Sequence, residues 1–426
     1  MEYVLHEQII SFVFLAAAIA IGCLLKKNMG AVSIGLALIL GRIFGVSDKV
    51  IINSFNSSLF VMLLGVMFLF SIAQNNRTLE LLARKAVILC RGKVQLIPIV
   101  LFVFSAVVSA LGPGLISTTA LVAPLAIAFA VETKVDPIRL VLFGALGAFA
   151  GGLSPITPSG IVAIDVAAKN GIDGVELAIA LSMFLVMLLC AVVLYFFVFK
   201  WHKYKKPVES KDVDGSENAN EPFKKEHIFT LVGLVLVAVL SMVFEMNVGL
   251  VSFAVSVVLL ILGAADEAEA FKKIPWSTLV MITGVGMLIS VVTELGGIKL
   301  ISDIMQKIMN EYVASAVATV FSGVTSWVSS ASGVVMPTYI PMVADWLRSI
   351  PNLNAVDVVT GICIGANVAA FSPLSSCGAI MLAAYSNSKV ATPEGRQKMF
   401  NRLFIFSAAC IGVSAFIALT GFFKLF

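Results

Sequence analysis

Long apolar runs separated by short polar turns make up most of the chain. Ten of them approach the length of about 20 residues that a helix needs to cross a bilayer. We expect spanning helices at about 9–25, 31–46, 56–73, 139–168, 176–199, 228–244, 247–263, 276–293, 355–385 and 403–424. Two further apolar segments, 95–131 and 313–347, are each interrupted near the middle. A basic amphipathic stretch at 74–93 is typical of a helix on the membrane surface, and a shorter amphipathic stretch follows at 296–312.

Composition agrees with this pattern. The 426 residues are 59% hydrophobic and 13% charged, and the mean hydropathy is +1.02. Soluble domains of this size are less apolar, so we expect an all-α polytopic membrane protein. The six cysteines form no CxxC pair, which argues against a disulfide framework and a zinc site. Without a Walker motif or a nucleophile–base constellation, we expect neither an enzyme nor a nucleic-acid-binding protein, and no cofactor.

One hydrophilic segment, Lys200 to His227, divides the chain. It is rich in Lys, Glu, Asp and Asn, which is typical of a disordered linker. The two halves, 1–199 and 228–426, have the same order of apolar, amphipathic and interrupted segments. Equivalent residues keep a nearly constant separation: 218 positions separate Ser154 from Ser372 and Gly160 from Gly378, and 217 separate Pro124 from Pro341. We infer an internal duplication.

The interrupted segments decide the topology. If 95–131 and 313–347 are hairpins that enter the membrane and return to the same side, each half has five spans and the halves are inverted. If both segments span, each half has six crossings and the halves are parallel. With the linker cytoplasmic, the inverted topology puts 22 of the 29 Lys and Arg residues inside and 7 outside. The positive-inside rule therefore favours five spans and one re-entrant hairpin per half, in the inner (plasma) membrane, with both termini outside.

Four clusters of Gly, Pro, Ser and Thr interrupt the apolar segments. They are "GPGLISTTALVAP" and "SSASGVVMP" in the hairpins, and "GGLSPITPSG" and "AAFSPLSSCG" in the fourth and ninth spans. Unwound backbone is tolerated in a membrane only where it is buried in protein or lines a cavity. A lone Ser-Pro or Thr-Pro is more often a kink, and a membrane hydroxyl often bonds its own helix. Four clusters in two-fold register favour a midplane binding site between broken helices.

The residue types indicate what such a site binds. Half-helix N-termini carry free N–H groups and partial positive charge, which suit an oxyanion, whereas freed carbonyls and hydroxyls suit Na⁺. We expect substrate to be bound by Ser117, Thr118, Thr119, Thr157, Ser159, Ser330, Ser332, Ser375 and Ser376. Candidate Na⁺ ligands lie at Gly114, Ser154, Pro155, Gly333, Asn367 and Ser372. Asp165 is either a cation or proton group or an interfacial partner of Lys169, and we favour the second role.

These four motifs resemble those of the ion transporter superfamily, in particular the divalent anion–sodium symporters and the malonate-carrier (MatC)-like dicarboxylate transporters. The resemblance implies that the tips and breaks bind the substrate carboxylates and flanking Na⁺ ions, and that the protein is a homodimer. It also implies an elevator motion, in which the hairpins with spans four, five, nine and ten slide against a scaffold of spans one to three and six to eight. The symporters usually carry Ser-Asn-Thr at each tip, whereas here the first tip has Ser117-Thr118-Thr119 and the second has no such triplet.

We therefore expect a secondary active transporter of a small organic anion, a malonate- or succinate-like dicarboxylate, driven by Na⁺ or H⁺ symport. The alternative within the same superfamily is an inorganic-ion antiporter, which would need an embedded acidic residue near the breaks. An intramembrane enzyme or a channel is a weaker alternative, because catalytic groups are lacking and a channel needs no paired hairpins.

Overall fold

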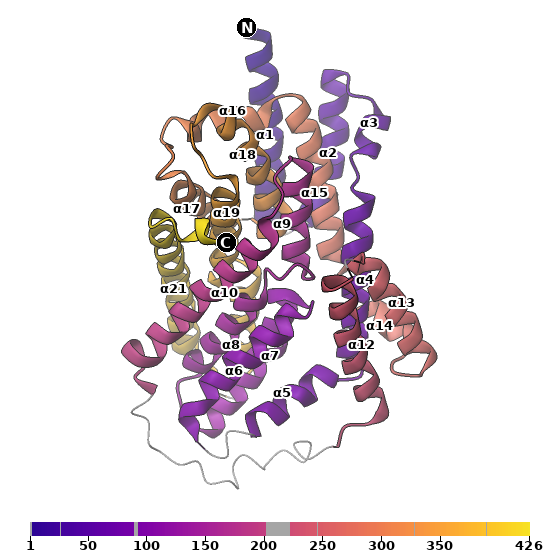
Figure 1. Cartoon of the computed structure of the whole chain (residues 1–426), viewed down its shortest axis with the longest axis vertical. Helices are drawn as coiled ribbons and strands as arrows, with labels where there is room; N and C mark the ends of the chain where they lie inside the picture. Colours follow the sequence, from indigo (N-terminus) through magenta and orange to yellow (C-terminus); the bar gives the residue numbers. More distant parts are fainter. Residues whose placement is uncertain are drawn as a thin grey trace.

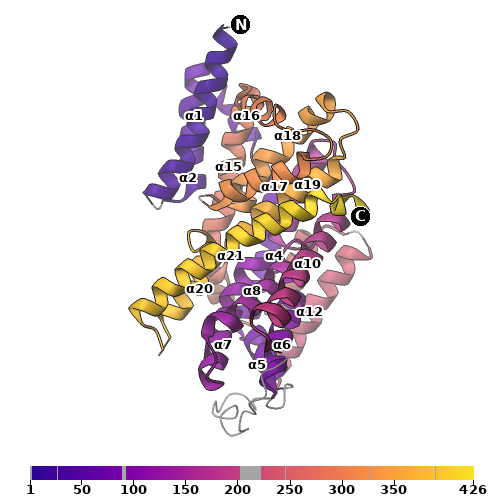
Figure 2. The ribbon, with the colours of Figure 1, turned by 90° about the vertical axis from the view of Figure 1, so that its left-hand side faces the viewer.

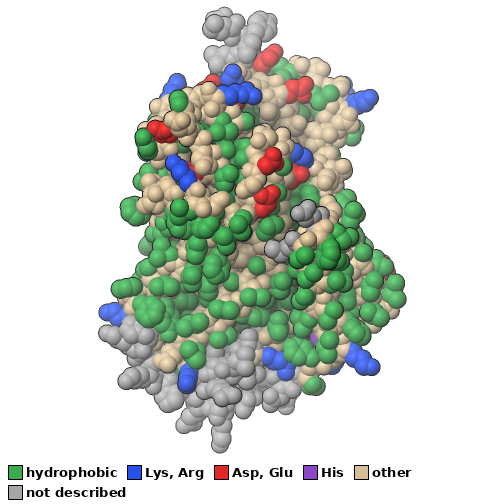
Figure 3. Space-filling view, in the orientation of Figure 1, with side chains coloured by type: hydrophobic (Ala, Val, Ile, Leu, Met, Phe, Trp, Pro, Cys, Tyr) green, Lys and Arg blue, Asp and Glu red, His purple; other side chains and the backbone are tan. Residues whose placement is uncertain are grey.

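The computed structural model describes residues 2–25, 27–88, 93–201, 222–244, 246–327, 329–388 and 390–426. Every regular element in these ranges is a helix (Figure 1). Six helices are long and apolar enough to cross a membrane: 57–75, 114–131, 175–198, 276–294, 355–386 and 393–419. Hydrophobic side chains cover the middle of the face in Figure 3, and Lys and Arg lie toward its ends. The prediction of an all-helical, multi-pass membrane protein is confirmed.

The first half follows the predicted order of elements. It contains α1 (Glu2–Leu24), α2 (Met29–Phe44), α3 (Asp48–Asn53), α4 (Ser57–Asn75), α5 (Thr78–Ile88), η1 (Val94–Leu96), α6 (Ile97–Ala110), α7 (Gly114–Glu132), α8 (Pro137–Gly151), α9 (Pro158–Lys169), α10 (Val175–Val193) and the π-helical turn η2 (Leu194–Val198). The short helix α3 was not predicted, because its six residues are too few to show a hydrophobic period.

The second half has the same order. It contains α12 (Lys225–Met242), α13 (Val248–Ile261), α14 (Glu267–Lys273), α15 (Trp276–Glu294), α16 (Gly297–Gln306), α17 (Ala314–Trp327), the π-helical turn η4 (Ala331–Val335), α18 (Met336–Ser349), α19 (Ala355–Val368), η5 (Ala369–Phe371), α20 (Ser376–Ser386), α21 (Pro393–Leu419) and η6 (Phe422–Leu425).

The predicted linker differs from the structure at its C-terminal end. Residues 202–221 lie outside the described residues, but α12 already begins at Lys225. The Nδ1 atom of His227 accepts a hydrogen bond from the Lys224 backbone N–H at 3.2 Å, and the imidazole is buried. Because of this cap inside a charged stretch, the helix begins at Lys225, three residues before the apolar run at 228 from which its start was predicted.

The helices form two groups that lie side by side (Figures 1 and 2). The framework group, to the right in Figure 1, contains α1–α4 and α12–α15, in which α2 packs on α15 and α4 packs on α13. The core group, to the left, contains α6–α10 and α17–α21, in which α8 and α19 are buried at the centre. The helices α5 and α16 lie at opposite ends of the molecule.

Glycines allow the framework helices to cross closely. A Cβ atom at Gly284 of α15 would overlap the carbonyl oxygen of Gly30 in α2. In the same way, a Cβ atom at Gly65 of α4 would overlap the carbonyl oxygen of Gly249 in α13. Gly30 and Gly249 are 219 positions apart, as are Gly65 and Gly284. The two halves therefore contribute the same small residues to two equivalent crossings, where close backbone contact replaces the hydrophobic driving force that lipid removes.

The core group is held by matched contacts from both halves. The Ser109 hydroxyl of α6 donates to the Ala148 carbonyl of α8 at 2.6 Å, and the Ser326 hydroxyl of α17 donates to the Ala366 carbonyl of α19 at 2.7 Å. Glycine on α8 allows the same close packing, because a Cβ at Gly147 would overlap the Phe102 carbonyl. The rings of Phe149 and Phe371 stack at a centroid distance of 4.0 Å and join the halves at the centre.

The glycine crossings give a stability test on one helix. Gly284→Ala forces a methyl group into the Gly30 carbonyl, and overpacking of this kind costs about 1–3 kcal/mol. Gly286→Ala is the matched control, because nothing lies within 4 Å of its added Cβ. We expect the melting temperature of the purified protein to fall for Gly284→Ala and to stay unchanged or rise slightly for Gly286→Ala. Equal melting temperatures for the two variants would contradict the close crossing.

Candidate functional site

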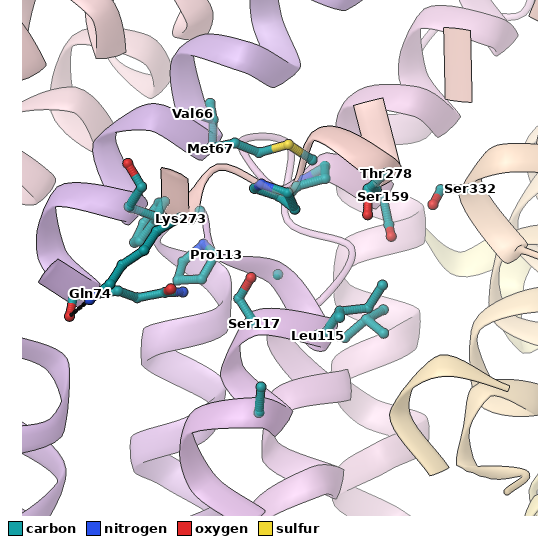
Figure 4. A pocket seen from close by; sticks show the side chains of 18 residues that line it. Val66, Met67, Gln74, Pro113, Leu115, Ser117, Ser159, Lys273, Thr278 and Ser332 are labelled. Atoms are coloured by element: carbon teal, nitrogen blue, oxygen red, sulfur yellow. Dashed lines mark hydrogen bonds between the residues drawn. The ribbon is translucent and has the colours of Figure 1, made fainter. Parts of the chain in front are cut away.

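A cavity of about 220 Å³ opens where the framework and core groups meet (Figure 4). Its walls come from α4, the start of α7, the start of α9, the segment between α14 and α15, and η4. Polar side chains on the wall include Ser71, Gln74, Ser117, Ser159, Lys273, Thr278 and Ser332. All of the lining residues belong to the described part of the chain, and none of them is Asp or Glu. We refer to this space as the first cavity.

The first hairpin tip reaches the cavity through glycine backbone. Gly112 and Gly114 adopt φ values of 136° and 69°, a region that side chains disfavour, and α7 starts at Gly114 directly after this turn. No side chain caps α7, so N–H groups of its first turn have no helical acceptor. Gly114 and Ser117 both line the first cavity. The tip therefore presents an uncapped positive helix end to the cavity.

The first broken helix closes its own backbone. The Thr157 hydroxyl accepts from the Gly160 N–H at 3.1 Å and lies 2.8 Å and 2.7 Å from the carbonyl oxygens of Gly152 and Ser154, to which it donates. A side chain at Gly160 would overlap the Ser154 carbonyl, so the loop fits tightly against the start of α9. Pro158 and Ser159 begin α9 and line the first cavity. Thr157 is fully buried and shapes the cavity wall without lining it.

The second hairpin tip is held by a similar cap. The Ser330 hydroxyl accepts from the Gly333 N–H at 3.1 Å at the start of η4. The next hydroxyl, Ser332, lines the first cavity, whereas Ser330 lines another one. The second tip therefore contributes to both cavities.

A second cavity of about 310 Å³ lies at the second break. It is lined by Gly22, Lys27, Asn28, Met29, Ser277, Met281, Ser329, Ser330, Leu374, Ser375 and Ser376. The Asn28 side-chain amide donates to the backbone carbonyl of Ser277 at 2.8 Å, which ties the start of α2 to the start of α15. Thr278 faces the first cavity and Ser277 the second, so the first turn of α15 separates them.

The structure divides the predicted site residues into three sets. Gly114, Ser117, Ser159 and Ser332 line the first cavity, and Ser330, Ser375 and Ser376 line the second. Eight predicted residues line neither: Thr118, Thr119, Ser154, Pro155, Thr157, Gly333, Asn367 and Ser372. Their roles as ligands stay predictions.

Thr118 and Asn367 belong to these eight residues and are buried with unused polar atoms. Within the described residues, neither the Thr118 hydroxyl nor the Asn367 amide oxygen has a hydrogen-bond partner. The amide nitrogen of Asn367 donates to the Cys363 carbonyl at 2.8 Å, which fixes the direction of its oxygen. Because a buried polar atom without a partner is costly, these two oxygens are suited to a cation or a water molecule.

Several cavity residues could not be found from the sequence. They lie at helix ends of the framework group or in the turn before α2: Lys273, Thr278 and Gln74 in the first cavity, and Lys27, Asn28 and Ser277 in the second. No motif links these positions to the tips or breaks. A pair of basic residues before an apolar helix, as at 272–273, is the usual pattern of a membrane boundary.

No acidic residue of the described ranges lines either cavity. Asp165 accepts a hydrogen bond from Asn56 at 2.7 Å and forms an ion pair with Lys169 at 3.1 Å, in agreement with the preferred prediction for it. Asp357, which the sequence did not single out, is buried, with one carboxylate oxygen 4.0 Å from the Lys424 ammonium. Among the described residues, no group of three or more His, Cys, Asp or Glu could hold a metal ion.

The cap at the first break has a local test. Thr157→Val removes the capping oxygen, and loss of an N-cap costs about 1 kcal/mol. We expect amide hydrogen exchange in the first turn of α9 to become about fivefold faster, and Thr157→Ser to restore it. Thr392→Val is the matched control. Thr392 caps α21 by accepting a hydrogen bond from the Gly395 N–H at 3.0 Å, and it lines neither cavity. If Thr157→Val leaves exchange in α9 unchanged, the cap is not what holds the break.

Comparison with known proteins places these features in context. Residues 5–152 match the family model described as the dicarboxylate carrier protein MatC N-terminus. A search of curated proteins finds no significant match. Among solved structures, the YdaH transporter of Alcanivorax borkumensis superimposes with a TM-score of 0.62 at 13% identity, covering 87% of each chain. That likeness shows a shared fold.

The matched family consists of carriers, and the protein of similar fold is a transporter, so neither comparison indicates an enzyme. The family match covers both the first hairpin motif and the start of the first break. The resemblance to MatC-like dicarboxylate carriers is therefore confirmed over residues 5–152 of this membrane protein.

Proposed function

We propose that the protein is a secondary active transporter of a small organic dianion, a malonate- or succinate-like dicarboxylate. The observation that carries this proposal is the chemistry of the first cavity. Hydroxyls of Ser117, Ser159 and Ser332 line it, the first turns of α7, α9 and α15 reach it, and no described lining residue is acidic. Helix N-termini and hydroxyls favour a carboxylate, and the absence of acidic groups on the wall removes repulsion.

The size of the cavity also supports a small substrate. Its volume of about 220 Å³ is below the roughly 300–1,000 Å³ of pockets for drug-sized ligands. A three- or four-carbon dicarboxylate suits such a space. The match of residues 5–152 to dicarboxylate carriers supports the same substrate class.

The two halves of the fold are, in this proposal, inverted repeats. Equivalent glycine crossings and equivalent Ser–carbonyl hydrogen bonds support the repeat, and the opposite positions of α5 and α16 support the inversion. Four side-chain contacts join residues that the predicted topology puts on the same side. They are Arg402–Asp136 and Asn76–Thr230 on the cytoplasmic side, and Asn56–Asp165 and Lys424–Asp357 on the outer side.

The same arrangement supports transport by an elevator motion. The core group carries both tips and both breaks, and the framework group supplies the opposite wall of each cavity. A slide of the core group as one body would carry a substrate bound to the tips past the framework helices. We propose that the core group is the transport domain, that the framework group is the scaffold, and that the protein works as a homodimer in the inner (plasma) membrane.

Na⁺ is the proposed coupling ion, with H⁺ as the alternative. Neutral oxygen atoms are the ligands that such a cation takes in broken helices. The unpaired, buried amide oxygen of Asn367, close to the second break in sequence, supports a Na⁺ site there. An inorganic-ion antiporter is disfavoured, because Asp165 and Asp357 each contact a lysine ammonium and line neither cavity.

Ligand-induced thermal stabilisation tests the substrate class. A ligand that binds only the folded protein raises its melting temperature. We expect malonate or succinate to stabilise the purified protein, and Ser117→Ala to raise the dissociation constant about tenfold, because a hydrogen bond to a charged ligand contributes about 1.5–3 kcal/mol. The matched control is Ser386→Ala, whose hydroxyl bonds the Leu382 carbonyl of its own helix and lines neither cavity. If no carboxylate raises the melting temperature of the wild type, the proposed substrate class is refuted.

Replacing Na⁺ by choline in the same assay tests the coupling ion. We expect dicarboxylate stabilisation to fall sharply without Na⁺, because the cation offsets the charge of the dianion. Asn367→Ala should raise the Na⁺ concentration needed for half-maximal stabilisation several-fold. Full stabilisation in choline would exclude Na⁺ as the required partner and leave H⁺ coupling or exchange.

A further inference from the structure

Lys273 is the only charged side chain among the described residues that line the first cavity. It is the last residue of α14, in the framework group, whereas most hydroxyls of the cavity belong to the core group. Figure 4 shows the lysine chain on the wall near Gln74 and Pro113, with Ser117, Ser159 and Ser332 on other parts of the cavity. One full positive charge therefore shares a small space with neutral hydroxyls.

Packing fixes the backbone that carries this lysine. The ring of Phe271 lies against Phe68 of α4 at a centroid distance of 4.6 Å. The Trp276 indole N–H donates to the Phe271 carbonyl at 3.1 Å, and Ile274 is buried. The end of α14 is thus held against α4 and α15, although α14 itself has only seven residues. The Lys273 Cα is immobilised at the cavity, and its long side chain keeps its freedom.

The contact that the Lys273 ammonium makes is a weak one. It donates to the backbone carbonyl of Gln74 at 3.2 Å, in the last turn of α4, where the helix dipole supplies partial negative charge. A carbonyl at a helix end carries only a fraction of the charge of a carboxylate, so an anion in the cavity would compete for the ammonium. Lysine suits this exchange, because its ammonium is a compact charge on a flexible stem.

We propose that Lys273 selects for dicarboxylates by binding the second carboxylate of the substrate; this rests on the proposed function. Hydroxyls and helix N-termini of the core group hold the first carboxylate and would hold a monocarboxylate equally well. The second carboxylate needs a full positive charge once it leaves water, and the described wall offers one such charge. Lys273 is a specificity-determining residue contributed by the framework group.

The neighbouring lysine provides a control with the same charge on the same helix. The Lys272 ammonium donates to Glu269 at 2.6 Å, which raises the pKa of Lys272, and its side chain is 72% exposed. Lys272 does not line the first cavity. Lys272→Gln therefore removes one positive charge from this region and leaves the cavity wall intact.

The experiment compares a dianion with its half-ester. Binding of malonate and of its half-ester, monomethyl malonate, is measured by titration calorimetry on the purified full chain. The two share the three-carbon diacid skeleton, and the half-ester has a neutral methyl ester in place of one carboxylate charge. The variants are Lys273→Gln, Lys273→Arg and Lys272→Gln, and their melting temperatures without ligand check the fold. We expect Lys273→Gln to weaken malonate binding about tenfold and to leave half-ester binding within about twofold. Lys273→Arg should keep most of the preference, and Lys272→Gln should match the wild type.

Each outcome decides the proposal. If Lys273→Gln binds malonate as the wild type does, or loses malonate and half-ester affinity equally, Lys273 does not read the second carboxylate. If Lys272→Gln loses as much malonate affinity as Lys273→Gln does, the effect comes from general surface charge, and the assignment to Lys273 is overturned. If the wild type binds neither malonate nor succinate, the proposed function itself fails. This failure is distinguishable from failure of the Lys273 assignment, because it is seen with the wild type before any variant is made.

Discussion

Unpaired backbone groups are costly in an apolar interior, and this constraint governs the way the two spanning helices are interrupted. At the first break, Thr157 bonds the Gly160 N–H and two loop carbonyls, so the unwound segment satisfies much of its own polarity. At the second break, the Ser372 hydroxyl accepts from the Leu374 N–H at 3.2 Å, and Gly378 lies so close to the Ser372 carbonyl that a side chain would not fit. The breaks are compact loops that position the first turns of α9 and α20.

The same constraint explains why the breaks lie inside the core group. The half-helices α8 and α19 are almost wholly buried, and hairpin helices α6 and α17 cover them through close glycine and serine contacts. A closely packed group of this kind holds helix ends against one another. The framework group is built differently, from two crossings at glycines with exposed apolar side chains such as Ile261 facing outward. The core group thus presents polar helix ends to the cavities, and the framework group forms the opposite wall.

Electrostatics at the junction follows from this division. The core group contributes neutral dipoles, namely hydroxyls and helix N-termini, which stabilise an anion without holding it too firmly for release. The full charges on the cavity walls, Lys273 and Lys27, come from the framework group. The full charges therefore belong to one body and most of the hydroxyls to the other, and relative motion of these bodies would change the affinity for an anion.

Much of this protein follows from its sequence. Apolar run lengths determine the helices, Gly-Pro-Ser-Thr clusters determine where helices break, and the 218-residue offset determines that elements recur in order. These features are local, because each depends on backbone chemistry within a few residues. Only the tertiary structure decided which hydroxyls share a cavity, that Thr157 shapes the wall instead of lining it, and that Lys273 reaches the same space as Ser117 and Ser332. The composition of each cavity depends on how helices from distant parts of the chain pack and cross. Close contacts at glycines such as Gly30 and Gly284 set the crossing geometry, and no local sequence pattern encodes which helices meet there.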